Sequence, residues 1–465
     1  MIKKNIIYIK IFILFFILFF SCSCSPSQMK VENLIKAPKL TGKFYDIDKA
    51  LKSVAGENIV LKYPKSGDYR SPFVLCDIDN DNEDEAIVFY LDDENNIKFN
   101  VLDKISNKWT SIFSTVGPGV DVEKILISDI VNNNTNQIIV NWIKPNGIDH
   151  SLQVYNYEKN GLKCIYNKDY LTDVFMFDLD NDSKDELIVV DKTLKITPKI
   201  EVIKKIDESG ELEKIFYVKL MSPSSGNCKK ITMGKVVEGV NAIFLDSQIE
   251  DFDTDNTINY TEIICFNKNK ELKNLIFDKD KDFEINQVLG KTIRSEDIFC
   301  KDIDLDNIIE VPTSLSYHLG SDQKTEIKDK ILSLTVWQKY RNGGLEISNL
   351  SVENLQDGYS FVFPDNWFKI NQYQVVEPLV IAFYNEKNKE IIFKTNDQDL
   401  NEIMSIKILE LSDEIYKNTD KSLDQYFELE RKNNFVYYVK INNQNNNLKI
   451  SLRDIKKYFS ITYRR

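Results

Sequence analysis

An acidic loop between two apolar segments recurs along the sequence and constrains the fold more than any other feature. In its first copy, an apolar segment at residues 73–76 ends at Asp77, carboxylates follow at alternate positions, and a second apolar segment begins after Glu85. Two further copies keep these charges, whereas a copy that starts at Asp129 has lost most of them. The opening Asp and the closing Glu or Gln have the same separation in all four. A unit repeated in this way predicts a repeat architecture.

Hairpin patterns follow each acidic loop and predict four strands in each repeat. After the first loop, apolar segments at residues 97–102 and 109–113 are joined by a polar turn. Four-stranded antiparallel units of roughly 50 to 60 residues, repeated radially, form a β-propeller. The sequence therefore predicts a mainly β protein: a β-propeller of about five four-stranded blades at residues 55–352, followed by a small α+β domain at residues 353–465.

The loops suit a hard cation of calcium's size, because several anionic oxygens converge on one point and a backbone carbonyl completes the set. The alternative is a set of acidic turns that Asx hydrogen bonds hold without metal. The loop at Asp129 is predicted to bind no metal, since it supplies too little negative charge. The candidate metal ligands are Asp77, Asp79, Asp81, Glu85, Asp178, Asp180, Asp182, Glu186, Asp302, Asp304, Asp306 and Glu310.

The strand–loop–strand units resemble the FG-GAP and VCBS repeats of bacterial surface propellers and integrin heads, whose loops have the form Asp-x-Asp-x-Asp-Gly-x-x-Asp. The resemblance implies structural calcium, and it covers the loop and flanking strands of three repeats. It departs at two positions, because the usual Gly is Asn82, Ser183 or Asn307 and the usual last Asp is Glu. Ser adopts left-handed backbone less readily than Asn, so metal binding is least secure in the loop with Ser183.

The C-terminal region has a different pattern. Residues 358–367 combine Gly-Tyr-Ser-Phe with a following Pro and Trp, and strands, a helix at residues 424–431, a strand at residues 435–441 and a final helix are expected after them. Ser451 and Asp454 form a capping-box pattern at the start of that last helix. The motif and the order of elements resemble the α/β domains related to the photosystem protein PsbP. An unclassified α+β domain is the alternative.

The N-terminus has the pattern of a targeting segment. Three lysines precede an apolar run at residues 11–20, which is too short to span a bilayer comfortably, and Cys22 and Cys24 follow it. This segment resembles the bacterial lipoprotein signal, which implies a signal peptide at residues 1–21 and a lipidated Cys22, with Cys24 as the alternative. Residues 22–54 would then hold the lipidated Cys and a polar tether, on the extracytoplasmic face of the cell membrane. An uncleaved membrane anchor is the competing interpretation.

Charge and cysteine content limit partners and chemistry. The formal net charge is −12 and becomes −15 without the three signal-peptide lysines, which argues against a nucleic-acid partner. The cysteines beyond the signal are odd in number and include no CxxC pair, so we expect free structural thiols. A Cys228–Cys265 bridge is the alternative.

Few residues indicate catalysis. His150 and His318 are the only histidines, and both are expected at the surface. No Gly-x-Ser-x-Gly, His-Glu-x-x-His, phosphate loop or dinucleotide motif is present. Whether the chain is an enzyme is therefore uncertain, and a non-enzymatic role is favoured.

These features predict a lipid-anchored extracytoplasmic binding or scaffold protein. Calcium would stabilise its propeller, and a rim of loops or the central channel would meet a protein or glycan partner. The alternative is an extracellular hydrolase or lyase on a propeller scaffold. A solute-binding lipoprotein is disfavoured, because two alternating α/β lobes are not evident.

Overall fold

The computed structural model describes ten segments of the chain, which are residues 40–158, 161–191, 198–205, 212–220, 227–251, 256–276, 291–315, 329–411, 425–442 and 447–462. The expected signal peptide, Cys22, Cys24, most of the tether and His318 lie outside these segments. Within them, no helix has the length and apolar character needed to cross a membrane.

Four antiparallel sheets follow one another along the chain and form the first four blades. In each, the strands pair in sequence order, apart from β1, which pairs with β3 beside β2 and extends that edge. The strands of the first two blades are β1 (Val60–Lys62), β2 (Phe73–Cys76), β3 (Glu85–Leu91), β4 (Ile97–Ile105), β5 (Lys108–Val116), β6 (Asp121–Ser128), β7 (Gln137–Ile143), β8 (His150–Glu158) and β9 (Gly161–Leu171). Those of the third and fourth are β10 (Asp173–Phe177), β11 (Glu186–Asp191), β12 (Lys199–Lys205), β13 (Leu212–Lys219), β14 (Asn227–Val237), β15 (Val240–Asp251), β16 (Asn256–Phe266) and β17 (Leu272–Asn274).

The fifth blade begins with a short segment in which Lys301 bridges Glu310, and this segment takes the place of a first strand. Its sheet continues with β18 (Val311–Leu315), β20 (Leu334–Arg341), β21 (Gly344–Asn354), β22 (Tyr359–Val362) and β30 (Phe459–Ile461). A sixth sheet has the order β19 (Lys330–Ile331), β25 (Val380–Asn385), β26 (Glu390–Thr395), β27 (Glu402–Glu410), β29 (Phe435–Ile441) and β28 (Tyr426–Lys432). The remaining elements are β23 (Phe368–Ile370), β24 (Val376–Pro378), the 3-10 helix η2 (Asp365–Trp367) and the helices α3 (Lys43–Ala55) and α6 (Leu452–Tyr458).

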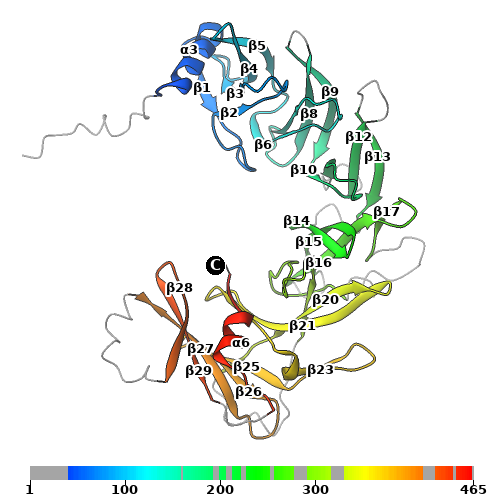
Figure 1. The fold of residues 1–465 in the computed structure, drawn as a ribbon, viewed down its shortest axis with the longest axis vertical. Helices are drawn as coiled ribbons and strands as arrows, with labels where there is room; N and C mark the ends of the chain where they lie inside the picture. Colours follow the sequence, from blue (N-terminus) through cyan, green and yellow to red (C-terminus); the bar gives the residue numbers. More distant parts are fainter. Residues whose placement is uncertain are drawn as a thin grey trace, which may run out of the picture.

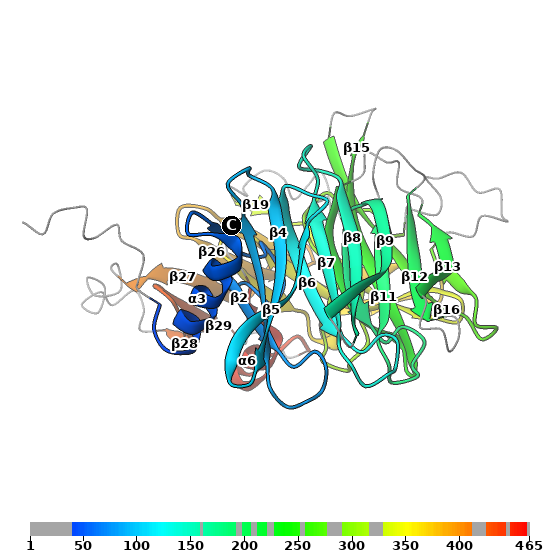
Figure 2. The same ribbon diagram turned by 90° about the horizontal axis from the view of Figure 1, so that it is seen from above.

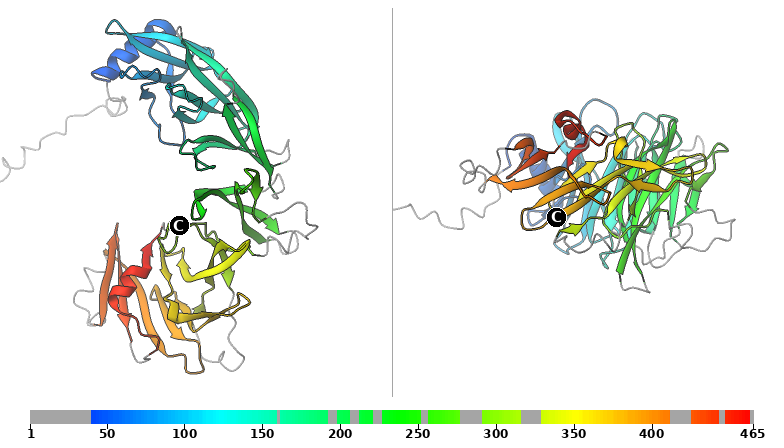
Figure 3. Two further views of the ribbon diagram at one scale, coloured as in Figure 1. Left: turned by 45° about the vertical axis from the view of Figure 1, so that its right-hand side comes forward. Right: turned by 90° about the horizontal axis from the view of Figure 1, so that it is seen from below.

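The sheets succeed one another around an arc, with the first blade at one end and the C-terminal sheet at the other (Figure 1; Figure 3, left). Seen from above, the strands of neighbouring blades stand side by side (Figure 2). The first strands of the blades lie on the inner side of the arc and the fourth strands on the outer side (Figure 1). This arrangement of four-stranded antiparallel blades is that of a β-propeller, as the repeats predict.

Each pair of neighbouring blades shares its own apolar core. Between the first and second, Trp142 is fully buried, and its ring meets Phe89 edge-on with 5.6 Å between ring centroids. Comparable clusters lie between the second and third, third and fourth, and fourth and fifth blades. Second strands are covered on both faces, so β7 is buried along its whole length. The blades are therefore held by contacts with their neighbours, as in other repeat folds.

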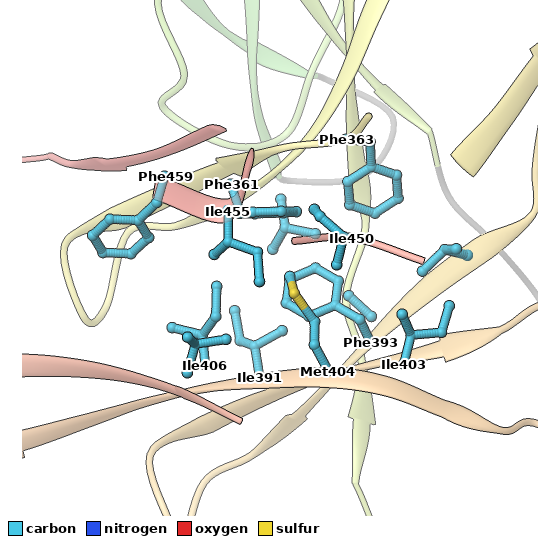
Figure 4. Close-up of a cluster of buried hydrophobic side chains, with 14 of the residues drawn as sticks. Phe361, Phe363, Ile391, Phe393, Ile403, Met404, Ile406, Ile450, Ile455 and Phe459 are labelled. Atoms are coloured by element: carbon cyan, nitrogen blue, oxygen red, sulfur yellow. The ribbon is translucent and has the colours of Figure 1, made fainter. Parts of the chain in front are cut away.

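The C-terminal region is joined to the fifth blade by both strands and core. β21 runs through the expected boundary at residue 352, and β22 and β30 extend the same sheet. One large cluster, which includes Phe361, Phe393 and Met404, fills the space between the fifth and sixth sheets (Figure 4). Ser451 caps α6 as expected, because its Oγ accepts a hydrogen bond from the Asp454 amide.

Two local predictions differ from the structure. Residues 426–432 form the edge strand β28 where a helix was expected, because pairing with β29 overrides the helix propensity of Glu and Leu. The last part of the expected tether forms α3, whose Ile47 and Leu51 are fully buried against the first blade. The five cysteines that the structure describes form no disulfide, as expected, and Cys265 and Cys300 are buried.

Candidate metal centre and inner-face pocket

The acidic loops occupy one equivalent position in four blades. They connect β2 to β3, β6 to β7 and β10 to β11, and in the fifth blade the loop joins the segment at Lys301 to β18. Each is therefore the connection between the first and second strands. In the fourth blade, β14 and β15 are joined instead by a tight turn at Gly239.

Hydrogen bonds from the backbone to the opening Asp shape each loop. The carboxylate of Asp77 accepts from the amides of Asn80, Asp81 and Asn82 at 2.6, 3.2 and 2.9 Å. The position that is Gly in the resembled repeats has left-handed backbone, with φ of 70° at Asn82, 68° at Ser183 and 69° at Asn307. Ser183 thus adopts the turn despite its lower preference for this conformation.

The closing residue is buried and faces back into the loop. Oε2 of Glu85 accepts from the Ile78 amide at 2.7 Å, and Glu186 and Glu310 make the corresponding bonds at 2.8 and 2.9 Å. Gln137 does the same with the Ile130 amide at 2.8 Å. All four side chains are at most 2% exposed. The fold therefore places a carboxylate or an amide inside each loop, whatever charge is available to balance it.

The structure gathers most of the predicted ligands. In each of three loops, carboxylate oxygens lie within 4.8 Å of one another and could hold a metal ion. Asp81 and Asp182 are outside these sets, whereas Asp306 is included. The sets are Asp77, Asp79 and Glu85; Asp178, Asp180 and Glu186; and Asp302, Asp304, Asp306 and Glu310.

A residue on the third strand faces the closing residue of each loop, and its charge differs from blade to blade. The strand registers pair Ala86 with Leu102 and Leu187 with Ile203, so the next residues along, Asp103 and Lys204, lie opposite the closing Glu in the first and third blades. The same position is Asn156 in the second blade and Lys339 in the fifth. Sequence reasoning missed this position.

In the third blade, the Lys204 ammonium lies among the carboxylates. Its Nζ is 2.6 Å from Asp180 Oδ2 and 2.7 Å from Glu186 Oε1. Burial raises the pKa of Glu186, and the ammonium opposes that rise. Burial lowers the pKa of Lys204, but the bonds to Asp180 and Glu186 outweigh burial, so the pKa is raised.

In the fifth blade, Lys339 has the same role and is more buried. Its side chain is 5% exposed, and Nζ is 2.7 Å from Asp304 Oδ2, 2.5 Å from Asp306 Oδ2 and 3.1 Å from Glu310 Oε1. Burial raises the pKa of Glu310 to about 7 despite this partner. These contacts outweigh the effect of burial on Lys339 and raise its pKa.

The first blade has no such cation among the residues that the structure describes. Glu85 Oε1 and Asp79 Oδ1 are buried and find no hydrogen-bond donor there. Burial raises the pKa of Glu85 to about 8, and the carboxylates of Asp79, Asp103 and Asp81 add to the rise. Buried oxygens without a donor, next to further carboxylates, fit a metal ion that would satisfy them.

The second blade neutralises its loop with amides. Gln137 Nε2 donates to Asn156 Oδ1 at 2.9 Å and to the Thr135 carbonyl at 3.0 Å. No carboxylate set lies at this place in the described chain, and that this loop binds no metal stays a prediction.

The loops also bind neighbouring blades together. Asn136, in the loop of the second blade, donates from Nδ2 to the Asp77 carbonyl at 2.8 Å and from its backbone amide to Ile78 at 3.0 Å. In the same way, Asn241 of the fourth blade donates to the Asp178 carbonyl at 2.5 Å. The geometry of a loop therefore affects the seam between two blades.

A polar pocket lies on the inner side of the arc. It has a volume of about 330 Å³ and is lined mainly by the first strands of the second, third and fourth blades, together with Ser66, His150 and Val190. Lys124 Nζ bonds Asp173 Oδ1 at 2.7 Å at this place, and Glu123, His150, Lys229 and Lys230 also line the pocket. His150 was predicted to lie at the surface, in a loop. It is instead half-buried at the start of β8. Burial lowers its pKa.

Comparison with solved structures gives similarities at low sequence identity. The chain is similar to a periplasmic gluconolactonase of Pseudomonas aeruginosa, with 11% identity and a TM-score of 0.30 over 73% of this chain and 86% of that one. It is also similar to the β-propeller domain of the trilobed protease from Pyrococcus furiosus, with 7% identity and a TM-score of 0.27 over 75% of this chain and 92% of that one. Such TM-scores carry no argument about function. No protein-family model and no curated protein sequence matches the chain.

Proposed function

We propose that this chain is a lipid-anchored extracytoplasmic binding protein whose propeller is stabilised by calcium and whose inner side receives a protein or glycan partner. The observation that carries the binding role is the inner-face pocket, because residues from four separate blades meet there. A surface assembled from several repeats on a rigid scaffold is a usual place for recognition. Cys22, or alternatively Cys24, would attach the chain to the membrane.

The pocket suits a polar partner. Three lysines, Lys124, Lys229 and Lys230, line it together with the carboxylates of Glu123 and Asp173. Lys124 is held by Asp173 and by the Val174 carbonyl, which leaves the exposed Lys229 and Lys230 to meet a ligand. The expected ligand groups are hydroxyls and carboxylates, as on acidic glycans or acidic peptide segments.

Binding can be tested with the full chain in detergent against a glycan array and an acidic peptide array. A variant with Lys229→Glu and Lys230→Glu should lose the ligands that the natural chain retains. Lys108→Glu, an exposed lysine on the outer strand β5, is the matched control and should retain them. Equal retention by all three proteins would remove the pocket as the binding surface.

Calcium is proposed at the first-blade loop, on the strength of the buried, unpartnered Oε1 of Glu85. An ion that binds only the folded chain stabilises it by about 2.7 kcal/mol when its concentration is 100 times Kd. The melting temperature should therefore be higher in calcium than in a chelator. Equal melting temperatures would eliminate the calcium brace.

The anchor has its own test. Cys22→Ala should abolish incorporation of labelled palmitate and release the chain from the membrane fraction, whereas Cys24→Ala should change neither. The opposite result would move the lipid to Cys24, and unchanged labelling in the double variant would refute the anchor.

A hydrolase or lyase is the second candidate, because His150 lies in the same pocket as Glu123 and Asp173. Its lowered pKa leaves the imidazole neutral near pH 7, as a general base requires. Turnover of a glycan or peptide substrate that His150→Ala abolishes would establish this alternative.

A further inference from the structure

We propose that Lys204 and Lys339 are built-in cations that occupy the place of a metal ion in the third and fifth blades. Of the described acidic loops, only the first-blade loop, where Asp103 is the facing residue, then holds a divalent cation. The bound cation in the first blade rests on the calcium site proposed above. The assignment of the two lysines rests on their own contacts and stands without that site.

Both lysine ammonium groups lie where a bound metal ion would lie. Each ammonium contacts the closing Glu and the second Asp of its loop, which are two of the carboxylates predicted as metal ligands. Lys204 Nζ also lies 4.0 Å from Asp182 Oδ2, and Lys339 Nζ lies 2.5 Å from Asp306 Oδ2. A metal ion could reach these oxygens only by displacing the ammonium.

The charge of the closing residue and the charge of the third-strand residue opposite it can be compared in every blade that has the loop. Glu186 and Glu310 face lysines, and uncharged Gln137 faces uncharged Asn156, to which it donates at 2.9 Å. Only in the first blade does the closing Glu face another acid, Asp103. The closing residue therefore faces a lysine or an amide in three loops and an acid in one.

The first-blade loop has no lysine beside its closing Glu within the described segments. Glu85 is fully buried, and its Oε1 has neither a hydrogen-bond donor nor an ammonium partner within the described segments. The corresponding oxygens of Glu186 and Glu310 are each in an ion pair with an ammonium, at 2.7 and 3.1 Å. The strand register places Asp103 of β4 opposite Glu85, outside the set of oxygens that lie within 4.8 Å of one another. A set of carboxylates alone suits a hard divalent cation of calcium's size better than a monovalent one.

The test is to exchange the facing residues and count bound calcium by equilibrium dialysis of the full chain in detergent. Asp103→Lys should bind one ion fewer than the natural chain, and Lys204→Asp, which reproduces the first-blade residue in the third blade, should bind one more. Lys205→Met changes the neighbouring lysine on β12 and is the matched control, with the same number of ions as the natural chain expected.

The possible results separate the two proposals. If the natural chain binds no calcium but Lys204→Asp gains one ion, the calcium brace fails and the lysine assignment stands. If both Lys204→Asp and Lys204→Met fold and bind no more calcium than Lys205→Met, the lysine assignment is overturned. Failure of both Lys204 variants to fold in the presence of calcium also overturns it, because calcium would then not replace the ammonium.

Discussion

The loops of the first and fifth blades share a backbone but differ in how their buried charge is balanced. Both opening Asp residues accept amide hydrogen bonds from the same loop positions, and both closing Glu residues accept one from the residue after the opening Asp. Yet Glu310 has Lys339 beside it, whereas Glu85 faces Asp103 and has an unpartnered oxygen. The loop conformation therefore does not depend on a lysine at the facing position.

The shape of the acidic loop is set by hydrogen bonds within the chain and does not require a metal ion. Main-chain hydrogen bonds to Asp and Glu set its shape, and the neighbouring blade clamps it through Asn136 or Asn241. Once the shape is fixed, the buried carboxylate requires a compensating group. The residue on the third strand is an ammonium in two blades and an amide in one, and under the proposal above the acid in the first blade leaves the place to an ion from solution.

The largest effect is expected from removing the more buried ammonium. Lys339→Met should lower the free energy of unfolding by about 3 kcal/mol in chelator, because three carboxylates then lose their only buried cation. Lys204→Met should lower it by about 1 to 2 kcal/mol, since Lys204 is more exposed and water screens its loop. Urea unfolding measures both changes, with Lys205→Met as the control. A larger loss for Lys204→Met would contradict the proposed role of burial.

The next effect concerns the first loop. Glu85→Gln removes the charge and keeps an oxygen for the Ile78 amide, as Gln137 does in the second blade. The calcium-dependent gain in stability, about 2.7 kcal/mol at 100 times Kd, should disappear. In chelator the variant should be at least as stable as the natural chain. Thermal melts with and without calcium provide the measurement, and a calcium response that survives the substitution would place the ion elsewhere.

An intermediate effect should follow when the second blade is given a charge. Gln137→Glu buries a carboxylate opposite Asn156 and should lower the free energy of unfolding by about 2 kcal/mol. Adding Asn156→Lys should restore at least half of that loss by reproducing the pair found in the third blade. A double-mutant cycle measures the coupling between the two positions. Additive losses would show that the facing residue does not balance the loop.

The smallest effect is expected at the seams. Asn136→Ala and Asn241→Ala should each lower the free energy of unfolding by about 1 kcal/mol, the value of one hydrogen bond to a loop carbonyl. The two losses should be alike, although one loop has a lysine and the other does not. Unequal losses in calcium that become equal in chelator would indicate that the ion tightens the first seam.

Much of the architecture could be predicted because it is written in local patterns. The alternation of strands and turns predicts four-stranded blades, and the constant spacing from Asp to Glu predicts equivalent loops. Capping at Ser451 follows from three neighbouring residues. The edge strand β28 was not predictable, because helix-forming residues there pair with β29, and Tyr426 donates to Glu390 at 2.7 Å.

The sequence by itself determined the repeating unit, the carboxylates of three loops and the loop at Asp129 that has lost most of them. Only the tertiary structure decided which residue faces each closing side chain, because that residue follows it by 18, 19, 18 and 29 positions in the first, second, third and fifth blades. Hairpins of different length shift the spacing along the chain, whereas the antiparallel register returns each residue to the same place in space. A charge balance that depends on pairing across strands is therefore visible only after the strands have been placed.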